Sequence, residues 1–270
     1  MGDPELPRPI LKPAGFLLDL DGTLYTDGHA VAGGPAALAE LRRLGTPFRC
    51  VTNTTTRDRA GLVARLEGYG YAVAAREIMT PAVAAVAICR DRGLEPALAL
   101  VPEAVLPDLS GLHLVSSGEA ARVVLVGDLR ERWNYGLLQQ AFDAMMDGAE
   151  LLALSKDRYF QNEGRLALDA GPFVAGLEYA TGRTATVVGK PSPSFYAAAR
   201  EELGKEPGSV VMVGDDLWSD VRGAQAAGMQ GWLVRTGKFR EESLRSSGIT
   251  PERTIASVAE LPGIVRGAKG

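Results

Sequence analysis

The chain has 270 residues, of which 46% are hydrophobic and 23% are charged, and its formal net charge is −4. This is the composition of one large or two smaller globular domains, and it provides no basic surface of the kind that nucleic acid requires. The two cysteines, Cys50 and Cys89, form no disulfide framework or zinc pattern, and two histidines argue against a His-rich metal site.

No apolar run reaches the length of a membrane span, and residues 1–12 contain no apolar signal core. The two cysteines are most simply interpreted as buried free thiols of a reducing compartment. We therefore expect a cytoplasmic protein that binds neither nucleic acid nor a membrane.

The first part of the chain alternates apolar strands with helical segments. Apolar residues of the first helical segment recur every three or four positions until Gly45, which suits a helix end. The elements predicted here are strands at 15–21 and 47–53 and helices at 33–45 and 55–70. This alternation predicts an α/β fold with a Rossmann-like parallel sheet and helices on both faces.

The pattern changes near residue 79 and returns to its first rhythm near residue 187. The middle segment predicts helices at 79–93 and 134–148 and strands within 96–103, 113–128 and 150–160. We interpret 79–186 as a smaller α/β unit inserted into a core made of 1–78 and 187–270. Asp128 ends the strand sequence "VVLVGD" without a second acid after it, so we interpret it as a turn residue.

Polar residues follow four predicted strands of the core. They are Asp19 and Asp21, Thr52 and Asn53, Lys190, and Asp215 and Asp216. Ligands of an open parallel sheet bind beyond the carboxyl ends of its strands, so these groups should converge. Carboxylates suit magnesium, and a carboxylate nucleophile with a cation, a lysine and hydrogen-bond donors describes a phosphoryl-transfer site.

The same residues carry a resemblance that covers nearly the whole chain. "DLDGT" at the end of the first strand, "VTN", "GKPSPSFY" and "VGDDLWSD" are similar to the four motifs of haloacid dehalogenase-like phosphohydrolases. An insert between the second and third motifs is typical of class IIA, which carries an α/β cap of the C2 type there. The stretch at 166–193 resembles the branch that contains phospholysine phosphohistidine inorganic pyrophosphate phosphatase and related phosphatases.

The resemblance implies a role for each polar residue. Asp19 would be the nucleophile and a metal ligand. Asp21 would act as the acid and base, with its backbone carbonyl on the metal. The remaining roles are Thr52 and Asn53 at the phosphoryl group, Lys190 as the stabilising cation, Asp215 as a metal ligand, and Asp216 and Asp220 in supporting positions. Asp220 could equally cap the helix that follows it.

The expected function is a magnesium-dependent phosphatase that acts on a small phosphorylated metabolite through an aspartyl phosphate. Animal members of the branch often have serine where this chain has Asp21. The presence of Asp21 favours ordinary phosphomonoesters as substrates, and phosphoamino acids and inorganic pyrophosphate stay open. A phosphoacceptor switch without turnover is the alternative from another class, although its acid pair would precede the acceptor in the sequence. The family also leaves a homodimer open.

Overall fold

The computed structural model describes residues 12–117, 120–162 and 165–267. These divide into two compact units, one made of 12–51, 66–77 and 196–267 and the other of 52–65 and 78–195. The predicted insert at 79–186 falls within the second unit. Among the described residues, no helix has both the length and the apolar character needed to cross a membrane.

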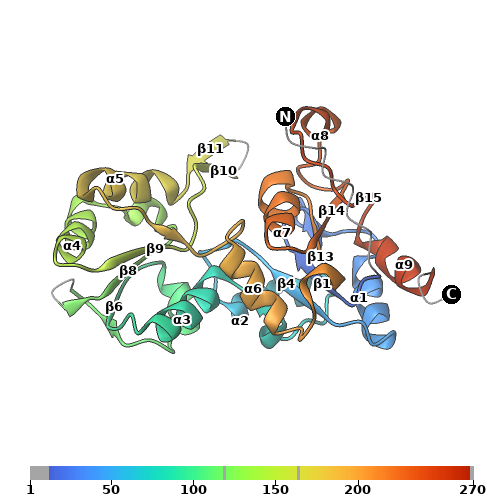
Figure 1. The fold of residues 1–270 in the computed structure, drawn as a ribbon, viewed down its shortest axis with the longest axis horizontal. Coiled ribbons are helices and arrows are strands. Elements are labelled where there is room, and N and C mark those ends of the chain that lie inside the picture. The colour runs from blue at the N-terminus through green and yellow to red at the C-terminus, as the bar shows by residue number, and fades with distance from the viewer. Residues whose placement is uncertain (1–11, 118–119, 163–164, 268–270) are drawn as a thin grey trace. The chain divides into compact units, whose positions relative to one another are not determined.

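The first unit is built around parallel strands that lie in the order β15-β14-β13-β1-β4 (Figure 1). Every residue of β1, β13 and β14 is buried. A strand that is buried on both sides needs cover on both faces of its sheet, which helices provide here. The strand bounds are β1 (Gly15–Asp19), β4 (Phe48–Val51), β13 (Val210–Gly214), β14 (Gln230–Val234) and β15 (Arg253–Ile255).

The helices of this unit have short, well-defined ends. Helix α1 begins after Gly33, whose φ is 75°, and has a proline in its first turn, as helix starts prefer. Helix α1 spans Gly34–Arg43, and α2 (Arg59–Gly68) begins in the second unit and ends in the first. The other helices are α6 (Pro193–Glu201), α7 (Gly223–Ala226), α8 (Glu241–Ser246) and α9 (Leu261–Gly267). Strands β2 (Tyr25–Thr26) and β3 (His29–Ala30) form a hairpin.

The second unit has its own parallel sheet, in the order β12-β9-β8-β6-β7. Helices α4 and α5 pack one face of this sheet into an apolar core, and α3 lies on the other face (Figure 1). The bounds are β5 (Ile78–Met79), α3 (Pro81–Arg92), β6 (Ala97–Leu100), β7 (Leu114–Val115), β8 (Val123–Val126), α4 (Tyr135–Met146), β9 (Glu150–Ala153), α5 (Gly171–Thr181) and β12 (Thr186–Val187).

Two features of the second unit bear on the sequence predictions. An antiparallel hairpin of β10 (Tyr159–Asn162) and β11 (Arg165–Leu168) follows β9. Asp128 is indeed a turn residue, because its Oδ1 accepts the backbone N–H of Arg130 at 3.0 Å. Both units are α/β, and the Rossmann-like parallel core with helices on both faces is confirmed.

Candidate active site

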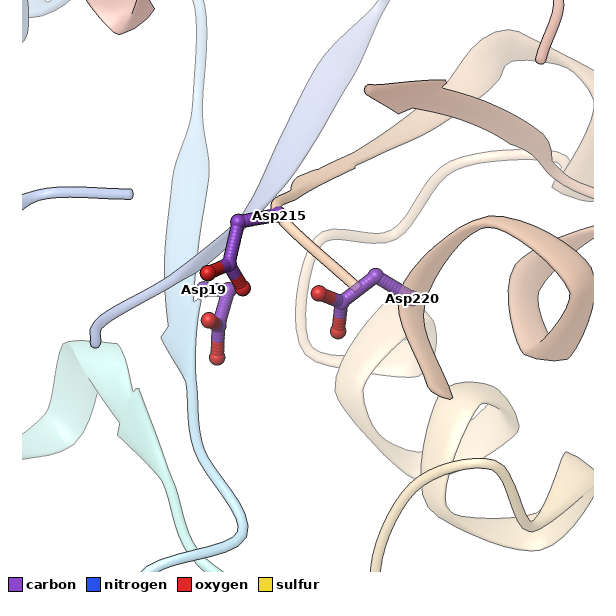
Figure 2. Close-up of side chains that lie close together, drawn as sticks. All are labelled: Asp19, Asp215 and Asp220. Atoms are coloured by element: carbon purple, nitrogen blue, oxygen red, sulfur yellow. The ribbon is translucent and has the colours of Figure 1, made fainter. Parts of the chain in front are cut away.

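Three buried carboxylates gather at the carboxyl ends of the central strands of the first unit. Asp19 is the last residue of β1, and Asp215 follows β13, its parallel neighbour. Asp220 lies in the π-helical turn Leu217–Arg222. One carboxylate oxygen from each residue lies within 4.8 Å of the others, and the three groups point toward one another (Figure 2).

The backbone around these carboxylates comes so close that only glycine fits. A Cβ on Gly22 would stand 2.0 Å from Asp215 Oδ2, and one on Gly237 would stand 2.1 Å from the same atom. A Cβ on Gly214 would stand 2.1 Å from Asp220 Oδ2. Gly22 and Gly237 also have φ values of 81° and 61°, which side chains rarely adopt. Glycine therefore shapes a tight cradle around the acids.

Hydrogen bonds hold two of these carboxylates in place. Asp215 Oδ2 accepts the backbone N–H of Lys238 at 2.7 Å, and Asp220 Oδ2 accepts that of Asp216 at 3.1 Å. The "RTGK" stretch at 235–238 thus forms a loop beside the acids. The sequence also favours a loop beside the site for this stretch, and the hydrogen bond to Asp215 joins residues 23 positions apart.

Asp216 caps the π-helical turn Leu217–Arg222. From the sequence, Asp220 is the residue considered as a helix cap. Asp216 Oδ1 accepts the backbone N–H groups of Trp218 and Ser219, both at 2.9 Å. Asp216 Oδ2 pairs with Lys238 Nζ at 3.2 Å, and the lysine side chain is exposed. Burial acts to raise the pKa of Asp216, but the Ser219 N–H, the Lys238 charge and the Trp218 N–H outweigh it and lower that pKa.

Asp21 is placed differently from Asp19, although only one residue separates them. Asp19 is 7% exposed, whereas Asp21 is exposed and its Oδ2 accepts a hydrogen bond from Tyr25 Oη at 2.9 Å. The side chain of Asp21 therefore does not belong to the three-carboxylate group. The expected metal contact of Asp21 is through its backbone carbonyl, which this placement leaves open.

Thr52, Asn53 and Lys190 belong to the second unit. Thr52 is 3% exposed, and its Oγ1 accepts the backbone N–H of Thr54 at 3.0 Å. Lys190 is 5% exposed. Asn53 Nδ2 donates to the backbone carbonyl of Lys190 at 2.9 Å, and the Lys190 N–H donates to Asn53 Oδ1 at 2.7 Å. The residues of the predicted second and third motifs are thus joined directly.

Asp108 is a residue of this unit that the sequence did not single out. It is 9% exposed, its Oδ1 accepts Arg59 Nε, and its Oδ2 accepts the Arg59 backbone N–H, both at 3.0 Å. These hydrogen bonds stabilise the start of α2, which follows the Thr52–Asn53 segment. No local pattern around Asp108 marks it, because its partner lies 49 positions away.

The comparisons with known proteins agree with this arrangement of motifs. A family model described as haloacid dehalogenase-like hydrolase matches residues 16–126, and one described as HAD-hydrolase-like matches residues 187–261. Human haloacid dehalogenase-like hydrolase domain-containing protein 2 is 42% identical over 241 residues, which cover 89% of this chain and 91% of that protein.

Two further relatives are named as phosphatases. Human phospholysine phosphohistidine inorganic pyrophosphate phosphatase is 36% identical over 252 residues, which cover 91% of this chain and 92% of that protein. The structure of p-nitrophenyl phosphatase from Archaeoglobus fulgidus matches with a TM-score of 0.87 and 28% identity, over 94% of this chain and 99% of that one. The likeness therefore extends over both units.

Proposed function

Because the chain belongs to the haloacid dehalogenase-like hydrolases and is a phosphatase of that family, we propose that it hydrolyses a small phosphorylated metabolite with Mg²⁺ through an aspartyl phosphate on Asp19. The observation that carries this proposal is the group of three buried carboxylates at the end of β1 and β13. Like charges buried together need a counter-charge, because desolvation and mutual repulsion both oppose their ionisation.

The donor set fits a magnesium ion. Asp19, Asp215 and Asp220 offer oxygen ligands from side chains that are each at most 7% exposed, and Mg²⁺ prefers a few carboxylates together with water. We assign Asp19 and Asp215 as ligands with the Asp21 carbonyl, and Asp220 as a ligand or as the anchor of a ligand water. When bound, the ion would neutralise charge on the phosphoryl oxygens and on the acids.

The chain's own groups divide the reaction between them. The Asp19 carboxylate attacks phosphorus, and the bond from phosphorus to the leaving oxygen breaks while Asp21 gives that oxygen a proton. Asp21 then takes a proton from the water that attacks the phosphorylated Asp19, which releases phosphate and restores both carboxyl groups. Thr52 would donate a hydrogen bond to the phosphoryl group, and Lys190 would stabilise its negative charge.

The leaving group defines two candidate substrate classes. An aspartate at position 21, as the group that gives and takes a proton, favours ordinary phosphomonoesters. The 36% identity to human phospholysine phosphohistidine inorganic pyrophosphate phosphatase favours phosphoamino acids or pyrophosphate as the second class. Substrates of either class would be small molecules. We propose no nucleic-acid or membrane partner, and we place the protein in the cytoplasm because Cys50 and Cys89 are buried free thiols.

Release of phosphate from p-nitrophenyl phosphate tests the proposal most directly. We expect many turnovers per chain with Mg²⁺ and loss of turnover after chelation. One phosphate retained per chain would instead indicate a phosphoacceptor switch. Unchanged turnover after thorough chelation would contradict the metal assignment, and a panel of phosphorylated metabolites ranked by kcat/KM would then identify the substrate class.

A further inference from the structure

A depression lies at the carboxyl end of the sheet in the second unit. Strands β9 and β12 are parallel neighbours, with Val187 opposite Ala153. The residues that follow both strands line an open depression of about 400 Å³, among them Lys156, Asp157, Lys190 and Ser192. Lys190 is the proposed phosphoryl-stabilising cation, so a group bound in this depression would lie beside Lys190.

The charge of Lys156 is already balanced. Its Nζ lies 2.7 Å from Glu178 Oε1, which also accepts the backbone N–H of Ala185 at 2.9 Å. Burial acts to raise the pKa of Glu178, but hydrogen bonds from Lys156 and the Ala185 N–H outweigh it and lower that pKa. Glu178 is therefore ionised at neutral pH and neutralises Lys156.

Asp157 differs from Lys156 because its side chain is exposed and makes no ion pair with any residue in the described ranges. Its backbone is nevertheless held firmly. The N–H of Asp157 donates to Ser155 Oγ at 3.2 Å, and its carbonyl accepts the N–H of Gly171 at 2.9 Å. A Cβ on Gly171 would stand 2.4 Å from that carbonyl oxygen. A fixed backbone thus presents a carboxylate that has no ion-pair partner in the part of the chain that the structure describes.

The neighbouring acids add to this negative field. The pKa of Asp169 is raised to about 6, chiefly by burial and also by the charges of Asp128 and Asp157, against the opposing effects of the Ala170 N–H and the Arg130 charge. Asp128 already pairs with Arg130. A cation at Asp157 would therefore relieve repulsion as well as form one new pair.

We propose that Asp157 selects the leaving group of the substrate: it favours one that carries an ammonium or another hydrogen-bond donor and disfavours one that carries a carboxylate. Lys190 and Asp157 then give the lining of the depression two groups of opposite charge, Lys190 for the phosphoryl group and Asp157 for the donor. This inference rests on the proposed function, because it needs Lys190 to act on the phosphoryl group.

Two small substrates of similar size test the proposal. 2-Aminoethyl phosphate carries an ammonium, and phosphoglycolate carries a carboxylate. We expect the wild type to have the higher kcat/KM for the first. Exposed charge pairs contribute up to about fivefold, so Asp157→Asn should lower the kcat/KM ratio of the two substrates about three- to fivefold. Asp157→Lys should lower it about tenfold or more, and Asp157→Glu should restore most of it.

Asp147→Asn is the matched control, because it removes another exposed acid of the same unit, at the end of α4 and outside the depression. Its kcat/KM ratio should equal that of the wild type, and added salt should shrink the wild-type preference. Equal kcat/KM ratios for the wild type, Asp157→Asn and Asp157→Lys would overturn the inference, provided that thermal melts show all three proteins to be folded. Turnover of p-nitrophenyl phosphate would still support the proposed function in that case. If the wild type hydrolyses no phosphate ester, the proposed function fails. The inference is then decided by calorimetry, which measures the affinity of the wild type and of Asp157→Asn for each of the two substrates. Equal affinities of the two proteins would overturn the inference.

Discussion

Asn53 and Lys190 are 137 positions apart, yet the amide of Asn53 exchanges two hydrogen bonds with the backbone of Lys190. The amide thus fixes the chain at the proposed catalytic lysine. We expect Asn53→Ala to lower the free energy of unfolding by about 1–3 kcal/mol, because two buried backbone groups lose their partner. We also expect kcat to fall about ten- to a hundredfold, since small displacements of catalytic groups are costly. Chemical denaturation and steady-state kinetics measure the two effects.

The control for this variant is Asn134→Ala. Asn134 also makes two hydrogen bonds with the backbone, one from Leu137 N–H and one to the Arg132 carbonyl, at the start of α4. Removing this cap should cost about 1 kcal/mol of stability and leave kcat unchanged. Equal kcat in the two variants would show that the Asn53 amide has no role in positioning Lys190.

Gly22 and Gly28 separate backbone strain from steric clash. Both have φ near 80°, at 81° and 79°, but only the Cβ of an alanine at position 22 would meet a carboxylate, whereas position 28 has nothing within 4 Å. Each alanine should cost about 1–2 kcal/mol of stability through its conformation. Only Gly22→Ala should also displace Asp215, and so weaken Mg²⁺ binding and abolish turnover. Metal titration by calorimetry would show this, and normal Mg²⁺ affinity in Gly22→Ala would contradict it.

The proposed roles of Asp19 and Asp21 can be distinguished, because replacing each residue by asparagine should block a different step of the reaction. Asp19→Asn removes the attacking charge, so it should abolish turnover and leave no phosphorylated protein. Asp21→Asn removes the acid and base, which is worth about 10²- to 10⁴-fold, but an activated ester such as p-nitrophenyl phosphate needs little protonation. This variant should accumulate phosphate on Asp19, which rapid quench, borohydride trapping and peptide mapping would locate. Label on any other residue would refute the assignment of the nucleophile.

Asp169 should make the stability of the protein depend on pH. Burial, with the charges of Asp128 and Asp157, raises its pKa from 3.8 to about 6, so the folded protein binds more protons than the unfolded chain between about pH 4 and pH 6. Stability from this group is therefore present at low pH and is lost as pH rises through about 6. Asp169→Asn stays neutral and keeps the acceptor for the Ala170 N–H, which donates to Asp169 Oδ1 at 2.6 Å.

We expect Asp169→Asn to be more stable than the wild type at pH 7, by at most about 2–3 kcal/mol, and equal to it near pH 4. Denaturant unfolding of both proteins at several pH values measures the difference. A difference that is constant with pH would indicate that the carboxyl group titrates normally in the folded protein.

The parts of the fold that depend on local pattern could be predicted from the amino-acid sequence. The apolar runs predict a strand at 15–21 and another that ends near Asp215. The observed strands are slightly shorter, at Gly15–Asp19 and Val210–Gly214, and every residue in both is buried. Because neighbouring parallel strands end at one edge of a sheet, the closeness of Asp19 and Asp215 also followed from the pattern.

Which further groups lie close to those acids depends on how distant elements pack. Asp220 joins Asp19 and Asp215 because the π-helical turn after Asp216 returns it to the strand ends, and the sequence allowed a helix cap equally well. The sequence predicts that Asn53 and Lys190 converge. It does not predict the hydrogen bonds that join them, nor the contact of Asp108 with Arg59, because no periodicity spans these separations. Periodicity reports which face of an element is apolar, whereas a contact between distant polar side chains depends on how whole elements pack.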